Sequence, residues 1–257
     1  KHLLMEILRG EWGFDGAVIT DWGGSNDHAL GVKNGSTLEM PAPGGDSVRE
    51  LLAAVESGKI TEADIDARLS ELLPLVFDTK AALDAAPREF DAAAHHALAR
   101  RAAEESLVLL KNEGALLPLA AGTKVAIIGD FAKNPRYQGA GSSMVNSTQV
   151  DVLLDKLIDS AVNVIGYQQG FDRHGKPDAV LQKSACELAA QANTVVLCMG
   201  LDEIAESEGL DRSNLRLAQN QVELLQAVKA VNPKIVVVLY SGSVVETPWL
   251  DNCQALL

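Results

Sequence analysis

The feature that most restricts the fold is a regular alternation of continuous apolar segments with helical patterns from Lys124 onward. The segments expected as strands cover residues 125–128, 162–167, 194–199 and 235–240, and those expected as helices cover 152–158, 179–190 and 217–231. Strands that are apolar throughout, each followed by a helix, are typical of a parallel sheet covered on both faces. The sequence therefore predicts an α/β domain with a mostly parallel sheet.

The N-terminal part of the chain shows a shorter pattern. Apolar residues at helical spacing predict a helix up to Gly10, and the apolar run at residues 17–20 predicts a short, fully buried strand. Two helices are expected next, one over residues 46–58 and a second after Thr61, which has capping-box spacing to Asp64. The buried side of the second helix is expected to carry four apolar residues, Ile65, Leu69, Leu72 and Leu73.

These two patterns divide the chain into two domains, for which 257 residues are sufficient. The first domain covers residues 1–78. The second covers residues 95–257 and opens with a helix up to about residue 104 and a strand over 106–110. Residues 79–94 combine a proline with alanines and charged residues, so they are expected to be a linker.

Composition restricts the partners and the compartment. The formal net charge of −13 argues against nucleic acid and anionic membranes, because both need clustered lysine and arginine to displace counterions. A neutral or cationic small molecule fits this charge better. Cys186, Cys198 and Cys253 lack CxxC and metal-ligand spacing and are expected to be buried free thiols, which favours a cytoplasmic location over a secreted one. No apolar run reaches the length of a membrane span, and no signal peptide is visible.

Asp21 is the first candidate site residue. It follows the apolar run at residues 17–20, so it lies at the carboxyl end of the expected strand, where parallel barrels carry their catalytic groups. Trp22 follows it, and a carboxylate beside an aromatic ring is a usual pairing for handling a sugar ring. The same residues are equally compatible with a simple turn that Asp21 caps. In the next loop, His28 is interpreted as solvated rather than as a sugar contact.

Two loops of the second domain are further candidates. Residues 139–143 are rich in glycine, which suits a simple turn or a phosphate-binding loop, although they lie too far from their strand for the GxGxxG pattern. Residues 200–217, called the acidic loop below, carry five carboxylates beyond the carboxyl end of an expected strand, where open α/β sheets bind ligands. From the residues alone, a solvated surface loop is the simpler interpretation of the acidic loop. Trp249 is interpreted as a core residue.

Two segments, LRGEWGFDGAVITDWGG at residues 8–24 and EGLDR at residues 208–212, carry a resemblance to a known family. They are similar to the nucleophile segment and to the acid/base signature of glycoside hydrolase family 3, the β-glucosidase family. The resemblance implies that Asp21 is the nucleophile and that Trp22 is a wall of the sugar pocket. It implies that Glu208 is the proton donor, with its neighbours Asp211 and Arg212 as structural companions.

The resemblance extends to two further places. The glycine-rich loop is similar to a family loop that reaches toward the sugar, which implies a substrate contact for Ser142. The run Glu39-Met40-Pro41 is similar to a family segment on the next barrel strand. That segment usually has Asp two positions before the Glu, where this chain has Thr37. The local role of that Asp is therefore open in this chain.

The function implied by the resemblance is that of a retaining β-glycosidase. Such an enzyme hydrolyses terminal β-linked sugars of small glycosides or oligosaccharides by double displacement, with no metal and no cofactor. The implied fold is the C-terminal part of a (β/α)8 barrel in residues 1–78, followed by an α/β sandwich domain in residues 95–257 that is incomplete at its C-terminus. The chain is then expected to be an internal fragment of a larger enzyme and inactive by itself.

Several questions stay open at this point. One alternative function is a Rossmann-like module that binds phosphate or a nucleotide at residues 139–143. Another is a folded fragment without activity. The sequence does not separate glucose from xylose or N-acetylglucosamine specificity, and it does not define the oligomeric state or the role of Glu206.

Overall fold

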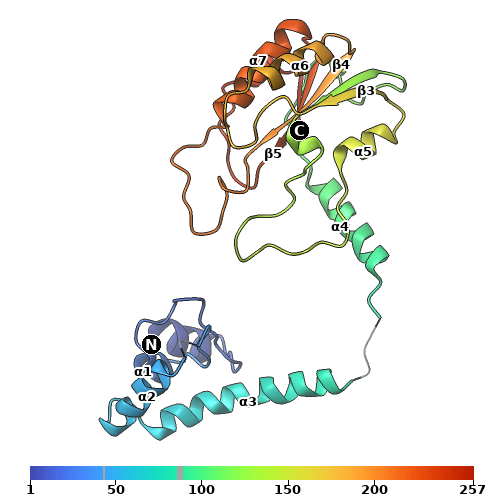
Figure 1. Ribbon diagram of the computed structural model, residues 1–257. Coiled ribbons are helices and arrows are strands. Elements are labelled where there is room, and N and C mark those ends of the chain that lie inside the picture. Colours follow the sequence, from blue (N-terminus) through green and yellow to red (C-terminus); the bar gives the residue numbers. More distant parts are fainter. Residues whose placement is uncertain (43, 86–88) are drawn as a thin grey trace. The chain divides into compact units, whose positions relative to one another are not determined.

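The computed structural model describes residues 1–42, 44–85 and 89–257 (Figure 1). The chain divides into two compact units, Lys1–Phe90 and Asp91–Leu257. Each unit has a hydrophobic core of its own. The expected linker at residues 79–94 includes residues 86–88, which lie outside the described residues.

The second unit is built around a six-stranded sheet with the order β1-β6-β5-β4-β2-β3. Its strands are β1 Lys111–Asn112, β2 Lys124–Ile128, β3 Asn163–Gln168, β4 Thr194–Gly200, β5 Ile235–Tyr240 and β6 Ala255–Leu256. Neighbouring strands are parallel except for β1 and β6, which are antiparallel. The mostly parallel α/β sheet predicted from the sequence is confirmed. The two-residue strands β1 and β6 are additions that the sequence pattern does not predict.

The helices of this unit are α4 Ala92–Ser106, α5 Leu153–Ile158, α6 Ala179–Ala189 and α7 Gln219–Val231, with 3-10 turns η2 Glu113–Ala115, η3 Asp130–Ala132 and η4 Leu250–Asn252. Helices α6 and α7 lie side by side (Figure 1). Asp178 starts α6 by accepting hydrogen bonds from the N–H groups of Val180 and Leu181. All seven residues of β4 are buried, as its continuous apolar sequence predicts. Trp249 also belongs to this core.

Two glycines let the central strands end close together. Gly129 has φ +113°, and a Cβ atom there would lie 2.1 Å from the carbonyl oxygen of Cys198. A Cβ atom at Gly200 would lie 2.3 Å from the carbonyl oxygen of Tyr240. Only glycine fits at both positions. Because β2, β4 and β5 are parallel neighbours, the loops that follow them leave from one edge of the sheet.

The first unit is mainly helical in its described part. It contains a π-helix, η1 His2–Glu11, and three α-helices, α1 His28–Lys33, α2 Asp46–Glu56 and α3 Glu62–Asp84. Its small core consists of Ala29, Ala54 and Ile60. The capping box at the start of α3 is confirmed, because the side chain of Thr61 accepts from the N–H of Asp64 and the carboxylate of Asp64 accepts from the N–H of Thr61.

Two strand predictions are wrong. At residues 17–20 the described chain forms a single parallel bridge, Ile19 with Leu38, and Ile19 is 49% exposed rather than buried. Among the described residues, the bridge partner of Ile19 is Leu38, and a strand becomes fully buried only where layers cover both of its faces. The other wrong strand is 106–110: α4 runs through Ser106, and the apolar run Leu107–Leu110 that follows is exposed. The strand begins at Lys111, which pairs with Leu256, and the N–H of Leu110 donates to the carbonyl oxygen of Leu256 at 2.8 Å.

The helix boundaries also differ from expectation. Helix α3 continues to Asp84 and so covers the first residues of the expected linker. Two of its four expected core residues, Leu69 and Leu73, are exposed, because the long helix extends beyond the small core of its unit. The six-residue helix α1 lies in a stretch expected to be a loop, and Asp27 starts it by accepting from the N–H of Leu30.

The cysteines are free thiols: Cys198 and Cys253 are buried and Cys186 is half-buried. Burial raises the pKa of the Cys198 thiol to about 12. Among the described residues, no helix combines the length and the apolar character needed to cross a membrane.

Candidate active site

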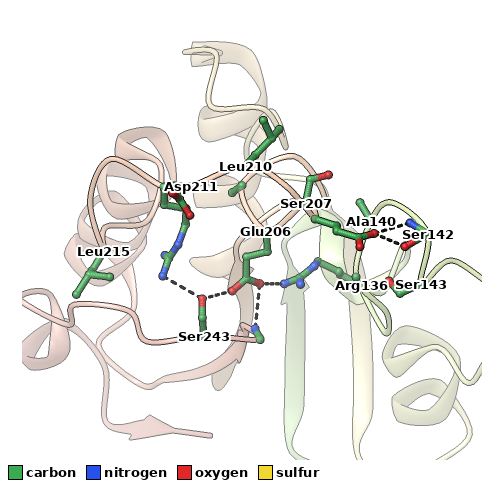
Figure 2. Close-up of a pocket in the computed structure, with 15 residues that line it drawn as sticks. Arg136, Ala140, Ser142, Ser143, Glu206, Ser207, Leu210, Asp211, Leu215 and Ser243 are labelled. Atoms are coloured by element: carbon green, nitrogen blue, oxygen red, sulfur yellow. Dashed lines mark hydrogen bonds and ion pairs between the residues drawn. The ribbon is translucent and has the colours of Figure 1, made fainter. Parts of the chain in front are cut away.

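An open pocket of about 1030 Å³ lies at the carboxyl edge of the sheet, between the loops that follow β2, β4 and β5 (Figure 2). Its lining residues come from those three loops and are Arg136, Gly139, Ala140, Ser142, Ser143, Ala205, Glu206, Ser207, Glu208, Leu210, Asp211, Arg212, Leu215, Gly242 and Ser243. The glycine-rich loop and the acidic loop, both selected from the sequence, therefore line the same pocket.

Glu208 and Ser142 meet across this pocket. One carboxylate oxygen of Glu208 accepts a hydrogen bond from the backbone N–H of Ser142, with N and O 2.9 Å apart, and another from the Ser142 hydroxyl. The N–H of Glu208 donates to the carbonyl oxygen of Ala140 at 3.3 Å. Gly141 has φ +95°, and a Cβ atom there would lie 2.9 Å from the Cβ of Glu208. Glycine thus lets the loop approach Glu208 closely.

The hydrogen bonds from the side chain and backbone of Ser142 lower the pKa of the exposed Glu208 carboxyl, against a smaller desolvation effect. Glu208 is therefore ionised at neutral pH in this arrangement. An ionised carboxylate can accept a proton as a general base, whereas an acid catalyst needs a raised pKa. For proton donation, a nearby negative charge or further burial has to reverse the shift.

Glu206 lies two residues earlier, and its side chain is largely withdrawn from solvent. It forms an ion pair with Arg136, and the two side chains are only 9% and 8% exposed. Its carboxylate also accepts hydrogen bonds from the N–H of Gly242, at 3.0 Å, and from the hydroxyl of Ser243. Burial alone would raise the pKa of Glu206, but these hydrogen bonds and the charge of Arg136 outweigh it and lower the pKa. Glu206 is thus a fixed anion in the wall of the pocket.

Ion pairs also hold the start of the acidic loop. Arg173 donates to Glu203, with Nε and Oε2 3.1 Å apart, and to Asp130, with Nη1 and Oδ2 2.5 Å apart. His174 Nδ1 lies 3.0 Å from a carboxylate oxygen of Asp202. Asp130, Arg173, His174 and Glu203 border a second, smaller pocket of about 480 Å³. The interpretation of this loop as simply solvated is wrong here, because partners on other loops pair with its carboxylates.

Asp21 and Trp22 lie in the first unit, directly after the bridge between Ile19 and Leu38. The carboxylate of Asp21 accepts from the N–H of Trp22 at 2.8 Å, and its carbonyl oxygen accepts from the N–H of Gly24 at 2.9 Å. Both side chains are exposed. The turn that the sequence left as an alternative is therefore present, and it presents the carboxylate and the indole to solvent.

His28 is not a solvated loop residue. Its ring nitrogens lie 2.9 Å from Glu39 Oε1 and 3.1 Å from the hydroxyl of Ser47, which itself donates to Glu39 Oε2 at 2.5 Å. The interpretation from the sequence fails because α1 turns His28 toward the segment of Glu39 and the start of α2. His28 therefore helps to hold the Glu39-Met40-Pro41 run in place.

Thr37 has a local role of its own. Its hydroxyl accepts from the N–H of Val18 at 2.9 Å and donates to Glu71 Oε2 at 2.7 Å. Glu71 is also paired with Arg9 and Arg68, at 2.7 and 2.6 Å. The carboxylate that binds Arg9 and Arg68 thus belongs to Glu71 on α3, and position 37 supplies a hydroxyl.

Of the four site residues predicted from the sequence, Ser142 and Glu208 meet in the second unit, while Asp21 and Trp22 are neighbours in the first. Arg136 and Ser243 also line the pocket and were not predicted from the sequence. A usable signal exists, because both follow strands of the parallel sheet and so lie near the same edge. Within the described ranges, no group of His, Cys, Asp and Glu side chains could hold a metal ion.

A profile of the Glycosyl hydrolase family 3 C-terminal domain matches residues 107–257. The chain belongs to glycoside hydrolase family 3. This confirms the resemblance inferred from the two sequence motifs.

Known proteins similar to this family 3 chain include an exo-α-(1→6)-L-arabinopyranosidase of Bifidobacterium breve, 40% identical over 266 residues, which cover 99% of this chain and 35% of that protein. The thermostable β-glucosidase B of Acetivibrio thermocellus is 39% identical over 263 residues, which cover 100% of this chain and 34% of that protein. The crystal structure of a family 3 β-glucosidase of Bifidobacterium adolescentis superposes with a TM-score of 0.91 at 41% identity, covering 99% of this chain and 37% of that one. The chain thus spans about a third of the length of these family 3 relatives.

Proposed function

We propose that the whole protein is a retaining glycosidase, with Asp21 as nucleophile and Glu208 as general acid and base. The observation that carries this proposal is the Glu208 carboxylate on the wall of an open pocket, held by Ser142 at the carboxyl edge of a parallel sheet. The similarity to proteins named β-glucosidase and arabinopyranosidase supports glycoside hydrolysis. Because the chain spans about a third of those relatives, the proposal concerns the whole protein.

We infer that the first unit is the C-terminal part of a (β/α)8 barrel. The parallel bridge between Ile19 and Leu38 is what two neighbouring barrel strands would form. Asp21 follows one of these strands and Glu39 follows the other, so both lie at carboxyl ends, where barrel enzymes carry their catalytic groups. The exposed face of Ile19 is consistent with further strands packing there.

The proposed reaction has two displacements. Asp21 attacks the anomeric carbon with a carboxylate oxygen, the glycosidic C–O bond breaks, and Glu208 gives its proton to the leaving oxygen. Water then gives a proton to Glu208 and attacks the anomeric carbon, which releases Asp21. Retaining enzymes hold their two carboxyl groups about 5 to 5.5 Å apart. At that distance the charge of Asp21 would raise the pKa of Glu208 and so oppose the effect of Ser142.

The proposed substrate is a small β-glycoside or oligosaccharide. The exposed indole of Trp22 offers an apolar face on which a sugar ring can stack. The hydroxyl of Ser142 can turn to a sugar hydroxyl when Glu208 moves to the glycosidic oxygen. None of these steps requires a metal or a cofactor.

A phosphate or nucleotide site at residues 139–143 is not favoured. The N–H of Ser142, the donor that would hold a phosphate, already donates to the carboxylate of Glu208. That carboxylate would also repel a phosphate group.

Covalent labelling of the whole enzyme tests the proposal. A 2-fluoro glycoside slows the second displacement, so the glycosyl-enzyme should accumulate, and mass spectrometry of a digest should locate the sugar on Asp21. The matched control, Asp21→Asn, should not be labelled. A label on Asp27 or Glu39, or first-formed product of inverted configuration, would overturn the proposal.

A further inference from the structure

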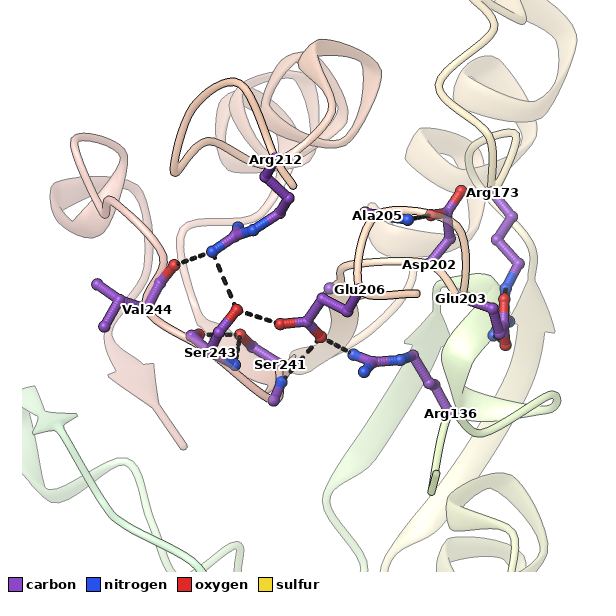
Figure 3. Close-up of polar contacts among 12 residues, drawn as sticks. Arg136, Arg173, Asp202, Glu203, Ala205, Glu206, Arg212, Ser241, Ser243 and Val244 are labelled. Carbon is purple, nitrogen blue, oxygen red and sulfur yellow. Dashed lines mark hydrogen bonds and ion pairs between the residues drawn. The ribbon is translucent and has the colours of Figure 1, made fainter. Parts of the chain in front are cut away.

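Glu206 and Glu208 are two residues apart on the acidic loop, yet their carboxylates have opposite environments. The carboxylate of Glu208 is exposed, whereas that of Glu206 is buried against Arg136, with both side chains less than 10% exposed. Figure 3 shows Glu206 between Arg136 on one side and Ser243 on the other. One carboxylate therefore joins the loops that follow β2, β4 and β5.

Ser243 extends this network to the far side of Glu208. Arg212 donates through Nη2 to the hydroxyl of Ser243 at 3.0 Å and to the carbonyl oxygen of Val244 at 2.7 Å (Figure 3). Glu206, Arg136, Ser243 and Arg212 are called the Glu206 cluster below. The segment 207–211, which contains Glu208, is thus held at both ends by the loop after β5.

The chemistry of the Glu206 cluster does not suit proton donation. The pKa of Glu206 is lowered despite burial, so the carboxylate is ionised at neutral pH and has no proton to give. A buried ion pair often adds little net stability compared with well-packed apolar side chains. The arrangement is better explained by the geometry that it fixes than by the energy that it contributes.

We propose that Glu206 is a positioning residue that fixes the direction in which Glu208 projects into the pocket, acting through Arg136 and Ser243. This inference rests on the proposed role of Glu208 in glycoside hydrolysis. Removing the charge of Glu206 would weaken its bonds to Arg136 and Ser243 and so let the start of segment 207–211 shift. A displacement of about 1 Å of a catalytic group can lower the rate on the order of 100-fold.

The experiment uses the whole enzyme and a series of aryl and alkyl β-glycosides whose leaving groups range from dinitrophenyl to methyl. Glu206→Gln keeps the shape of the side chain and one acceptor oxygen but removes the charge. For poor leaving groups, which need a proton from Glu208, kcat/KM should fall about 10- to 100-fold. For the dinitrophenyl glycoside, which leaves without a proton, it should fall less than about 3-fold.

Two further variants control for stability. Glu203→Gln removes an ion pair from the other end of the same loop, where Arg173 is the partner. It should change kcat/KM by the same factor for every leaving group. The leaving-group plot, of log kcat/KM against the pKa of the leaving group, should therefore keep the slope of the parent enzyme. Ser243→Ala leaves the pair of Glu206 and Arg136 in place and removes one bond to each end of segment 207–211. It should steepen the plot in the same direction as Glu206→Gln but less, and it provides the readout should Glu206→Gln fold poorly.

The outcomes separate this inference from the proposed function. If Glu208→Ala shows no dependence on the leaving group, the proposed role of Glu208 fails. If Glu208→Ala shows the dependence while Glu206→Gln and Ser243→Ala lower all substrates equally or not at all, Glu206 is only a structural residue and the inference is overturned. A steeper plot for Glu206→Gln and Ser243→Ala, with an unchanged slope for Glu203→Gln, supports it.

Discussion

The acidic loop and the Asp21 turn each present a candidate catalytic carboxylate, but the protein holds them in different ways. The acidic loop follows β4, whose residues are all buried. Three of its carboxylates, Asp202, Glu203 and Glu206, pair with residues from other loops of the sheet. The Asp21 turn follows a single bridge beside the half-exposed Ile19, and its carboxylate accepts from the N–H of the next residue.

The geometry of the two carboxylates is therefore determined in different ways. The position of Glu208 is fixed within its own unit by long-range hydrogen bonds. The position of Asp21 depends on a turn that local residues define, with few contacts to restrain it. Substitutions near Glu208 should therefore change both the stability and the catalytic rate, whereas substitution of Asp21 should change the catalytic rate alone.

The largest expected effect is that of Asp21→Asn in the whole enzyme. Removing a catalytic nucleophile lowers kcat on the order of 10⁴-fold or more. The melting temperature should stay that of the parent, because the Asp21 side chain is exposed and makes a local hydrogen bond that Asn can also accept. Steady-state kinetics and thermal unfolding measure the two quantities.

A matched control for Asp21→Asn is Asp27→Ala. Asp27 starts α1 and pairs with Lys59 at 2.8 Å, so its loss should lower the melting temperature of the first unit and leave kcat near that of the parent. If Asp21→Asn unfolds the protein or Asp27→Ala abolishes turnover, the comparison of the two regions is wrong.

The next prediction compares the packing of the two segments that precede the carboxylates, β4 and residues 17–20, in the 257-residue chain. Leu197 in β4 is fully buried, so Leu197→Ala should lower the free energy of unfolding of its unit by about 2 to 5 kcal/mol. Ile19 is 49% exposed, so Ile19→Ala should cost less than about 1 kcal/mol. Urea denaturation followed by circular dichroism measures both, and equal losses would show that the Ile19 segment is packed as tightly as β4.

A smaller effect is expected from the charge of Glu206. Its folded-state pKa lies below the ordinary value of 4.5, so its ionised form stabilises the folded state above that pH, and this stability is lost as pH falls through the folded-state pKa. Glu206→Gln should therefore destabilise the second unit by about 2 kcal/mol at pH 7. The deficit should shrink below pH 4.5 in urea titrations. A deficit that is the same at acidic and neutral pH would show that the charge of Glu206 does not matter.

The sheet of the second unit could be predicted because its longer strands are largely apolar and alternate with helices. The same reasoning failed at Leu107–Leu110, since an apolar run becomes a buried strand only if a neighbouring strand and a covering layer exist. Residues 17–20 were likewise predicted to be a fully buried strand, but they form a single bridge and Ile19 is half-exposed. Local signals were reliable where the partner is also local, as in the capping box of Thr61 and Asp64.

The candidate site was predictable only in part. The motif around Glu208 and the glycine-rich loop are visible in the sequence, but their hydrogen bond joins residues 66 positions apart. The pair of Arg136 and Glu206 spans 70 positions, and no local pattern indicates which carboxylate of the acidic loop becomes buried. That choice depends on the order of β2, β4 and β5 in the sheet, which brings their loops to one edge.

The central claim is that Glu208 exchanges the proton while Glu206 remains an anion, and azide rescue tests it most directly. In the whole enzyme, Glu208→Ala should turn over a dinitrophenyl glycoside slowly, and azide should restore turnover by attacking the glycosyl-enzyme in place of base-assisted water. The product should be a β-glycosyl azide. Glu206→Ala keeps Glu208, so azide should not accelerate it and no glycosyl azide should form. Rescue of Glu206→Ala with no rescue of Glu208→Ala would contradict the account.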